Sequence, residues 1–247
     1  MPEYLQLLIL FGVGLLAGVI NVMAGGGSSL TLPALIFIGL DSTVANGTNR
    51  IGILLQSVSA TLSYRKAKIS ELEKSIRLSL LTLPGALLGA LISLKISNEW
   101  FDRILGIVMI GIIVSMLVPQ KFEVITSGEK KSKLIYPVMF AIGFYGGFIQ
   151  VGVGFLIMAA LYHLLRMDLI RVNMHKVFIT MLFTVPALLI FIWTGNVNWV
   201  LGLCLAAGNS VGGWWAARIS LKGGEKAVRY VMVVAIFIIA LKLLGVI

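Results

Sequence analysis

Ten apolar segments make up most of this 247-residue chain, and they constrain its fold more than any other feature. A transmembrane helix needs about 20 consecutive apolar residues, and most of these segments approach that length. Only 12% of the residues are charged, roughly half the share that is usual in a soluble domain. The sequence therefore predicts an all-α polytopic membrane protein. The segments cover roughly residues 4–24, 28–40, 44–64, 75–94, 103–118, 134–152, 153–166, 176–193, 197–217 and 227–246.

Two of these segments, 28–40 and 153–166, are too short to cross a bilayer as ordinary helices. Three glycines at 25–27 precede the first, and the run Gly-Val-Gly at 152–154 opens the second. Glycine is costly in a helix interior, so a helix ends there, and the two serines that follow residue 27 can cap a new helix. Irregular backbone at membrane depth is tolerated only where protein buries it or where it lines a watery cavity. We therefore expect a binding site near the stretch 21–50.

The two short segments hold corresponding places in two weakly similar halves. Residues 14–22 align with 143–151, and residues 46–50 lie opposite 172–176. Five segments per half is an odd number, so the second half has to enter the membrane upside down. We therefore predict about ten transmembrane segments as two inverted five-segment repeats, with the short broken segments meeting near the midplane, as in many secondary transporters. The predicted domains are a first repeat over 1–118, a cytoplasmic linker over 119–133 and a second, inverted repeat over 134–247.

The basic residues gather in alternate loops, as this arrangement requires. Sixteen of the 20 lysines and arginines fall in the predicted loops 65–77, 119–133, 166–176 and 218–229. Cytoplasmic loops carry an excess of Lys and Arg, so these loops should face the cytoplasm and the N-terminus should lie outside. The formal net charge of +10 then reflects topology, and we expect no nucleic-acid partner because no soluble basic domain is present.

The polar groups expected at membrane depth are neutral or basic, because all ten acidic residues lie in loops or at segment ends. Intramembrane carboxylates mark proton relays and cation paths, so their absence argues against a carboxylate-based pump. Helices that begin at a break present N–H groups that favour anions. We therefore predict a small anionic substrate, with the lipid bilayer as the other partner. The candidate substrate-binding residues are Asn21, Gly26, Gly27, Ser28, Ser29, Thr48, Asn49, Arg50, Gln150, Asn173, His175 and Lys176.

These candidates also have structural interpretations. Arg50 and Lys176 can extend from helix ends to lipid headgroups. Asn21 and Gln150 can form hydrogen bonds between helices, as polar residues in membrane helices often do. His175 can be a packed or interfacial histidine.

Other patterns favour neither an enzyme nor a metal site. The sequence has no HExxH, CxxC or GxSxG motif, and its single cysteine, Cys204, lies in an apolar run. We therefore expect no enzymatic activity, no metal site and no cofactor. The glycines within 85–89 and 208–213 predict close helix packing. A homodimer is left open.

Several motifs, in their order along both halves, resemble the sulfite exporter TauE/SafE family of membrane permeases. They are Asn21 before the glycine-rich break, the run 24–28 (Ala-Gly-Gly-Gly-Ser), and the stretches 46–49, 84–89 and 143–148. The resemblance covers essentially the whole chain. It implies a secondary transporter that exports small sulfur-containing oxyanions, such as sulfite or organosulfonates, across the plasma membrane of a prokaryote.

The second half departs from this pattern, because Val153–Leu156 stands where a Gly-Gly-Gly-Ser turn is expected. Two alternatives to the implied function therefore stay open. One is an importer or antiporter of another small anion, and the other is a structural membrane protein that transports nothing. A cavity lined by Asn21, Ser28 and Arg50 would favour transport, whereas a tight apolar core at that place would favour a structural protein.

Overall fold

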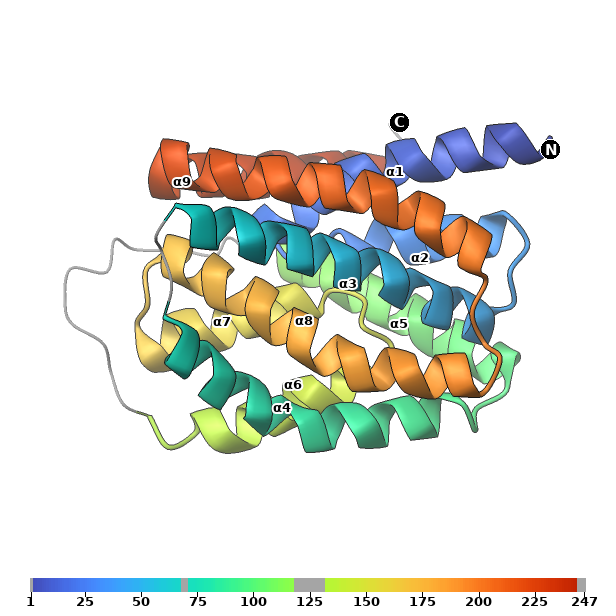
Figure 1. Cartoon of the computed structure of the whole chain (residues 1–247), viewed down its shortest axis with the longest axis horizontal. Helices are drawn as coiled ribbons and strands as arrows, with labels where there is room; N and C mark the ends of the chain where they lie inside the picture. The colour runs from blue at the N-terminus through green and yellow to red at the C-terminus, as the bar shows by residue number, and fades with distance from the viewer. Residues whose placement is uncertain (1, 68–70, 118–131, 244–247) are drawn as a thin grey trace.

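The computed structural model of the chain describes residues 2–67, 71–117 and 132–243. This part of the chain forms nine α-helices, most of which run side by side along the long axis of the molecule (Figure 1). The helices are α1 (Glu3–Met23), α2 (Ser28–Phe37), α3 (Ser42–Lys66), α4 (Leu72–Ser93), α5 (Asn98–Leu117), α6 (Ile135–Phe148), α7 (Val153–Leu165), α8 (Leu169–Trp193) and α9 (Trp199–Leu243).

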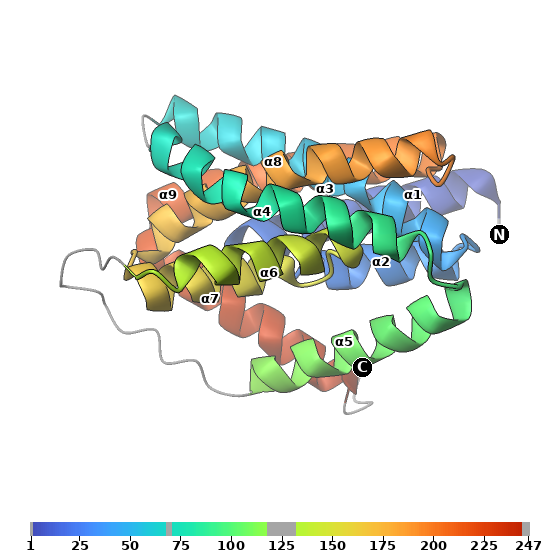
Figure 2. The ribbon, with the colours of Figure 1, turned by 90° about the horizontal axis from the view of Figure 1, so that it is seen from below.

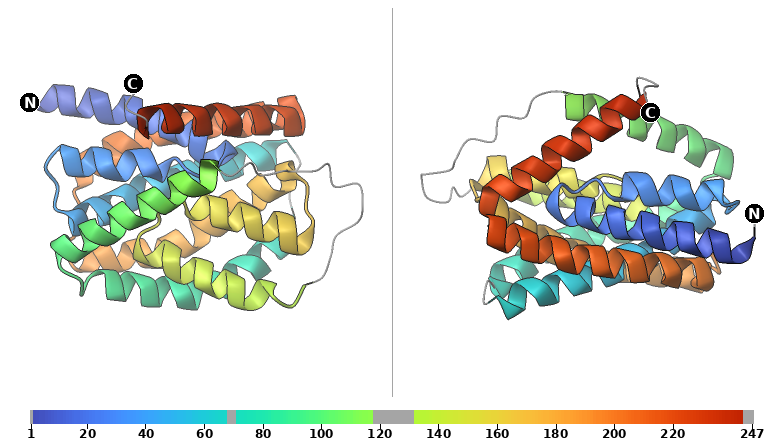
Figure 3. Two further views of the ribbon diagram at one scale, coloured as in Figure 1. Left: turned by 180° about the vertical axis from the view of Figure 1, so that it is seen from behind. Right: turned by 90° about the horizontal axis from the view of Figure 1, so that it is seen from above.

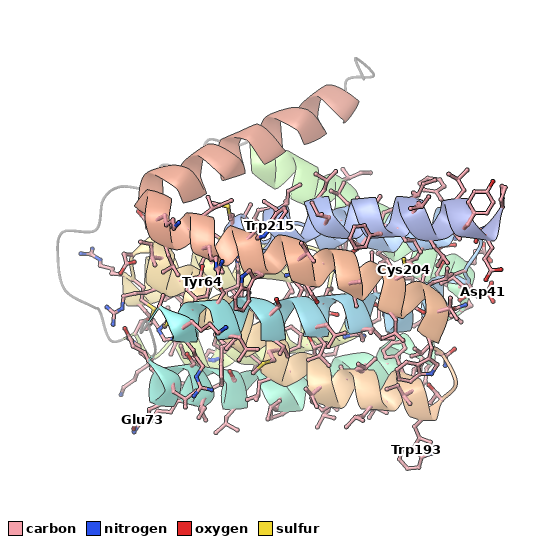
Figure 4. The ribbon with its side chains drawn as sticks, turned by 45° about the horizontal axis from the view of Figure 1, so that its top comes forward. Asp41, Tyr64, Glu73, Trp193, Cys204 and Trp215 are labelled. Atoms are coloured by element: carbon pink, nitrogen blue, oxygen red, sulfur yellow. The ribbon has the colours of Figure 1, made fainter. Side chains whose placement is uncertain are left out.

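Helices α1 to α7 each correspond to one predicted segment, but the last two segments do not stay separate. Residues 197–217 and 227–246 were expected as two spans, whereas the described part of both belongs to the single helix α9. The run 218–226 contains no proline, so nothing in it forces the helix to end. Instead α9 bends sharply, as Figure 4 shows, and glycine pairs such as that at 223–224 are common sites of kinks. The prediction of ten separate segments is therefore wrong for the described residues.

Helix α8 also begins earlier than the sequence suggested. The carboxylate of Asp168 accepts hydrogen bonds from the backbone N–H groups of Ile170 and Arg171, both at 3.0 Å, and so caps the helix. Lys176, which was assigned to the loop 166–176, therefore lies inside α8. Most of the predicted linker 119–133 lies outside the described residues.

Among the residues that the structure describes, four helical stretches are long and apolar enough to cross a membrane. They are α1, α4, α8 and the part of α9 from Trp199 to Gly223, and α2, α6 and α7 are shorter apolar helices. Trp193 is 91% exposed, and in Figure 4 it lies at the same end of the bundle as Asp41 and opposite Glu73. Exposed apolar surface of this kind suits contact with lipid, and tryptophan at a helix end suits the membrane interface. The chain is a helical, multi-pass membrane protein.

Glycines bring two pairs of helices into close backbone contact, as predicted. Helix α1 packs along α9, and α6 packs along α4 in the same manner. A Cβ atom added at Gly89 would lie 2.1 Å from the carbonyl oxygen of Phe144, and one added at Gly212 would lie 2.1 Å from that of Leu15. No side chain fits at these positions. The glycines at the two crossings are Gly14, Gly18, Gly208 and Gly212 for α1–α9, and Gly85, Gly89, Gly143 and Gly147 for α4–α6.

The interior of the bundle lies between α3 and α8. Helix α3 packs on α8 and α9, and α8 packs on α3 and α4, so the sides of these helices that face their neighbours are buried. The first turns of α5 pack on the bundle, where Phe101 is buried, and the rest of α5 diverges from the bundle beside the C-terminal part of α9 (Figures 2 and 3). The breaks between α1 and α2 and between α6 and α7 face this interior.

Candidate functional site

The two helix breaks touch each other through their glycines. Gly25 has a φ of +91°, in the region that side chains disfavour, and a Cβ atom added there would lie 2.5 Å from the carbonyl carbon of Gly154. The hydroxyl of Ser28 donates to the carbonyl oxygen of Gln150 and accepts from the N–H group of Gly152, both at 3.3 Å. Ser28, at the start of α2, thereby satisfies the polar backbone of the other break.

An amide side chain at each break binds a polar side chain on a long helix. The amide nitrogen of Asn21, near the end of α1, donates to the side-chain oxygen of Gln56 on α3 at 3.3 Å. The amide nitrogen of Gln150, after α6, donates to the hydroxyl of Thr184 on α8 at 2.6 Å. Gln150 is fully buried and has a φ of +59°, which is unusual for a residue with a side chain. The strained backbone aims its amide at α8.

Arg50 on α3 is fully buried and caps the C-terminus of α6. Its guanidinium donates to the carbonyl oxygens of Gly146 at 3.1 Å and Gly147 at 2.5 Å, and to the side-chain oxygen of Gln150 at 3.4 Å. The ring of Phe191 lies under it, 4.7 Å from the guanidinium carbon to the ring centroid. Its Nε atom has no hydrogen-bond partner. Carbonyl oxygens at a helix C-terminus carry partial negative charge, so this contact stabilises the cation.

Lys176 on α8 caps the C-terminus of α1 in the same way. Its ammonium group donates to the carbonyl oxygen of Val22 at 2.7 Å and to the side-chain oxygen of Asn173 at 2.8 Å. The amide of Asn173 donates to the carbonyl oxygen of Met23 at 3.4 Å, as that of Asn46 does to Phe148 on α6 at 2.9 Å.

No carboxylate of the described residues forms an ion pair with Arg50 or Lys176. A helix C-terminus offsets only about half an elementary charge. When both groups are protonated, roughly one positive charge or more is left uncompensated in the interior. A site of this sign attracts an anion.

A small central cavity lies between α3, α8 and the two breaks. Its volume is about 10 Å³, which is about the room that one water molecule needs. The hydroxyl of Ser57, which lines the cavity, is buried and has no hydrogen-bond partner. The lining residues are Asn21, Ser28, Ile53, Gln56, Ser57, Gln150, Val153, Gly154, Lys176, Val177 and Thr180.

The structure brings some of the predicted site residues to this cavity and leaves others away from it. Asn21, Ser28, Gln150 and Lys176 line it, and Arg50 and Asn173 hold two of these side chains. Gln56, Ser57 and Thr180 also line the cavity and were not predicted, although Gln56 and Ser57 directly follow the apolar run 51–55 of α3.

The remaining candidates make other contacts. The hydroxyl and N–H groups of Ser29 both bond to the carbonyl oxygen of Gly26, and Gly27 packs against Ala17. Asn49 accepts from the hydroxyl of Thr31 at 2.6 Å. The hydroxyl of Thr48 accepts from the N–H group of Asn198 at 2.9 Å. His175 lies beside Ser75 and Glu71.

The described part of the chain holds no group of three His, Cys, Asp or Glu side chains that suits a metal ion. Broken helices, buried cations and a polar cavity at their meeting point define a membrane transporter in the structural sense. The sequence pattern of the family described as "Sulfite exporter TauE/SafE" matches residues 10–243. The chain belongs to this family.

Relatives match over nearly the whole chain. The "Probable membrane transporter protein YfcA" of Escherichia coli strain K12 is 30% identical over 251 residues, covering 99% of this chain and 91% of its own. The "Probable membrane transporter protein ORF9" of Sinorhizobium sp is 27% identical over 241 residues, covering 97% and 92%. The "Probable membrane transporter protein YunE" of Bacillus subtilis is 25% identical, covering 97% and 98%. No solved structure matches the chain. The relatives support a membrane transporter.

Proposed function

We propose that this transporter carries a small sulfur-containing oxyanion, such as sulfite or an organosulfonate, and that the anion binds at the central cavity. In this structure the cavity has room for about one water molecule, so it must widen to admit the anion. The observation that carries the proposal is the pair of buried cations, Arg50 and Lys176, which have no carboxylate partner among the described residues. Lys176 also lines the cavity, beside the unpartnered hydroxyl of Ser57. A sulfonate or sulfite group presents three acceptor oxygens, which match an ammonium group and several hydroxyl and amide donors.

The direction that we propose is export. An inside-negative membrane potential drives an anion outward by about 2.3 kcal/mol per charge per 100 mV. The name of the family, sulfite exporter, agrees with this direction and with the substrate class.

We further propose that the two halves, 1–118 and 134–247, are inverted repeats with the N-terminus outside and the linker 119–133 in the cytoplasm. The packing supports equivalence of the halves, because α1 crosses α9 through the same glycine pattern by which α6 crosses α4. The crossed capping by Arg50 and Lys176 supports it as well. The basic loops support the orientation.

The alternative of a non-transporting structural protein predicts a tight apolar core at the breaks. Asn21 and Ser28 instead line a polar cavity there, although Arg50 reaches it only through Gln150. An importer or antiporter of another small anion uses the same features, so substrate and direction require a direct measurement.

Binding and flux of sulfite, sulfoacetate and thiosulfate should be measured with the purified protein, in detergent and in proteoliposomes. We expect saturable binding of at least one of these anions and outward flux that increases with an inside-negative potential. Lys176→Met, which removes the charge at similar volume, should weaken binding by about tenfold or more. The proposal would be overturned if none of the three anions binds, or if Lys176→Met binds and transports as well as the parent.

A further inference from the structure

A second pocket lies in the groove between α3 and α8 that also holds the central cavity. Residues 53–57 of α3 line the central cavity, and residues 61–65 line the second pocket, roughly 12 Å further along the helix. The second pocket has a volume of about 20 Å³, enough for one or two water molecules. It lies toward the end of the bundle where α3 ends and where α4 and α8 begin.

His175 is buried beside this pocket and has one uncommitted nitrogen. Its Nδ1 atom lies 2.8 Å from the hydroxyl oxygen of Ser75 on α4, which lines the pocket. Its Nε2 atom lies 3.4 Å from a carboxylate oxygen of Glu71, yet it is buried without a hydrogen-bond partner. A buried polar nitrogen without a partner is unfavourable. A proton on Nε2 would give it a donor that faces the Glu71 carboxylate directly.

The charged groups around His175 come from three helices. Glu71 also accepts from the Nε atom of Arg171 on α8 at 2.5 Å. Lys74 lies on α4, and Tyr64 and Arg65 of α3 line the pocket. The side chain of Glu71 is 32% exposed, so water reaches the cluster from this end of the bundle. Burial disfavours a charged imidazole, and the neighbouring cations oppose the single carboxylate, so His175 is neutral until negative charge is added nearby.

Consecutive residues of α8 connect this cluster to the central cavity. Lys176 and Val177 line the central cavity, whereas Met174 lines the second pocket and His175 lies beside it. Charge added in one pocket therefore acts on a charge in the other across a single helix, in a poorly screened interior.

We propose that His175, with Glu71 and Ser75, is a proton-binding site linked to the anion in the central cavity. This inference rests on the proposed function. The step starts from the neutral tautomer in which Nδ1 carries the hydrogen and donates to the hydroxyl oxygen of Ser75, so that Nε2 is free. Water in the second pocket delivers the proton, and Nε2 takes it. The imidazolium then pairs with Glu71 and adds positive charge in the second pocket, across α8 from the anion. Linkage is reciprocal, so a bound anion raises the proton affinity of His175 by the same factor as the proton raises the anion affinity.

The test measures how many protons the protein takes up when the anion binds. Binding of sulfoacetate to the purified protein should be measured by calorimetry in buffers of different ionisation enthalpy, because sulfoacetate has no group that titrates between about pH 6 and pH 8. We expect proton uptake on binding, and an affinity that rises by about tenfold from pH 8 to pH 6, within the usual range of coupling. His175→Gln should bind without proton uptake and with no pH dependence. His163→Gln, which replaces the only other histidine, is the matched control and should behave as the parent.

The possible results distinguish failure of the proposed function from failure of the proton site. If the parent binds no anion, the proposed function fails. If the parent binds sulfoacetate without proton uptake, or if His175→Gln keeps the uptake, the proton site is wrong while the anion site stands. Should His175→Gln fail to fold, Glu71→Gln provides a second variant, because it removes the charge that receives the imidazolium. Glu71→Gln should shift the pH dependence of the sulfoacetate affinity toward lower pH, and an unchanged pH profile would contradict the proposal.

Discussion

Arg50 and Lys176 each cap a helix that belongs to the other half of the chain, at the break where that helix ends. Arg50 of α3 donates to carbonyl oxygens at the end of α6, and Lys176 of α8 donates to one at the end of α1. Helix C-termini in broken-helix transporters often coordinate a coupling cation. In this chain two basic side chains, those of Arg50 and Lys176, take the place of such a bound cation. Their positions are fixed by backbone atoms, so the positive charge of the site is built into the fold.

Replacing Arg50 should reveal how much of its role depends on its shape. Arg50→Ala leaves the carbonyl oxygens of Gly146 and Gly147 without these partners, which costs about 1–3 kcal/mol for each buried group. Anion transport should fall by at least tenfold. Arg50→Lys should recover part of the loss, because it keeps the charge but not the planar fork. Proteoliposome flux and thermal unfolding measure both effects. Arg103→Ala is the control, because Arg103 is exposed and contacts Glu99 and Trp100 on its own helix, and an equal loss of flux there would contradict the prediction.

Ser57 and Ser59 provide a matched pair for testing the cavity. The hydroxyl of Ser57 has no partner and faces the cavity, whereas that of Ser59 donates to the carbonyl oxygen of Ser210 at 2.9 Å. Ser57→Ala should therefore leave the unfolding temperature unchanged or slightly higher and should weaken anion binding about tenfold. Ser59→Ala should cost about 1 kcal/mol of stability and leave binding unchanged. If Ser57→Ala binds sulfite, sulfoacetate and thiosulfate as the parent does, the anion does not contact this hydroxyl.

The contact between the two breaks can be tested at Gly154. A Cβ atom added there would lie 2.5 Å from the Cα atom of Gly25, so Gly154→Ala must push the breaks apart. We expect lower stability, by about 1–3 kcal/mol, and loss of transport. Gly12→Ala is the control, because nothing lies within 4 Å of a Cβ atom at that position. The unfolding temperature and the anion flux of both variants should be measured. A Gly154→Ala protein that behaves like Gly12→Ala would show that the breaks are not tightly packed.

Much of the fold could be predicted because apolar length and glycine breaks are local signals. The start of α2 at Ser28 and that of α7 at Val153 fall where the glycines indicated. The continuity of α9 could not be predicted, because a glycine pair between two apolar runs is compatible with a kink as well as with a loop. Asp168 caps α8, but the basic residues at 166–176 had predicted a loop there.

The candidate site was predicted only in part, because its geometry depends on long-range packing. The sequence identified Arg50 and Lys176 as a corresponding pair, but their partners are backbone carbonyl oxygens 97 and 154 residues away. Such contacts leave no pattern in the sequence. His175 was assigned to the anion site as one of the polar residues expected at membrane depth, yet consecutive helical residues face different directions, and its partners lie on α4.

The orientation can be tested by cysteine labelling in a Cys204→Ser background. Arg77 and Glu99 have side chains that are 76% and 73% exposed, and each pairs only with a residue one turn away, so a cysteine at either place should be tolerated. Arg77 follows a basic loop, which should face the cytoplasm. In intact cells, a membrane-impermeant maleimide should label Glu99→Cys and spare Arg77→Cys. The reverse pattern would place the N-terminus inside and overturn the proposed orientation.

The equivalence of the two halves predicts that matching glycines respond alike. Gly89 of α4 and Gly212 of α9 hold corresponding places at the two helix crossings, and an added Cβ atom would lie 2.1 Å from a backbone oxygen in each case. A backbone atom cannot rotate away as a side chain does, so alanine at either position forces the paired helices to separate. Gly89→Ala and Gly212→Ala should therefore each cost about 1–3 kcal/mol, measured as similar falls in the unfolding temperature.

Gly106 provides the control for helix propensity. It lies in α5 with nothing within 4 Å of an added Cβ atom, so Gly106→Ala should be neutral or stabilising by up to about 1 kcal/mol, because alanine is the better helix former. The double variant of Gly89 and Gly212 should show the sum of the single effects, since the two crossings join different helix pairs. A large loss of stability at one crossing together with none at the other would mean that the two crossings contribute differently to stability. The packing would then no longer support the proposed inverted repeat.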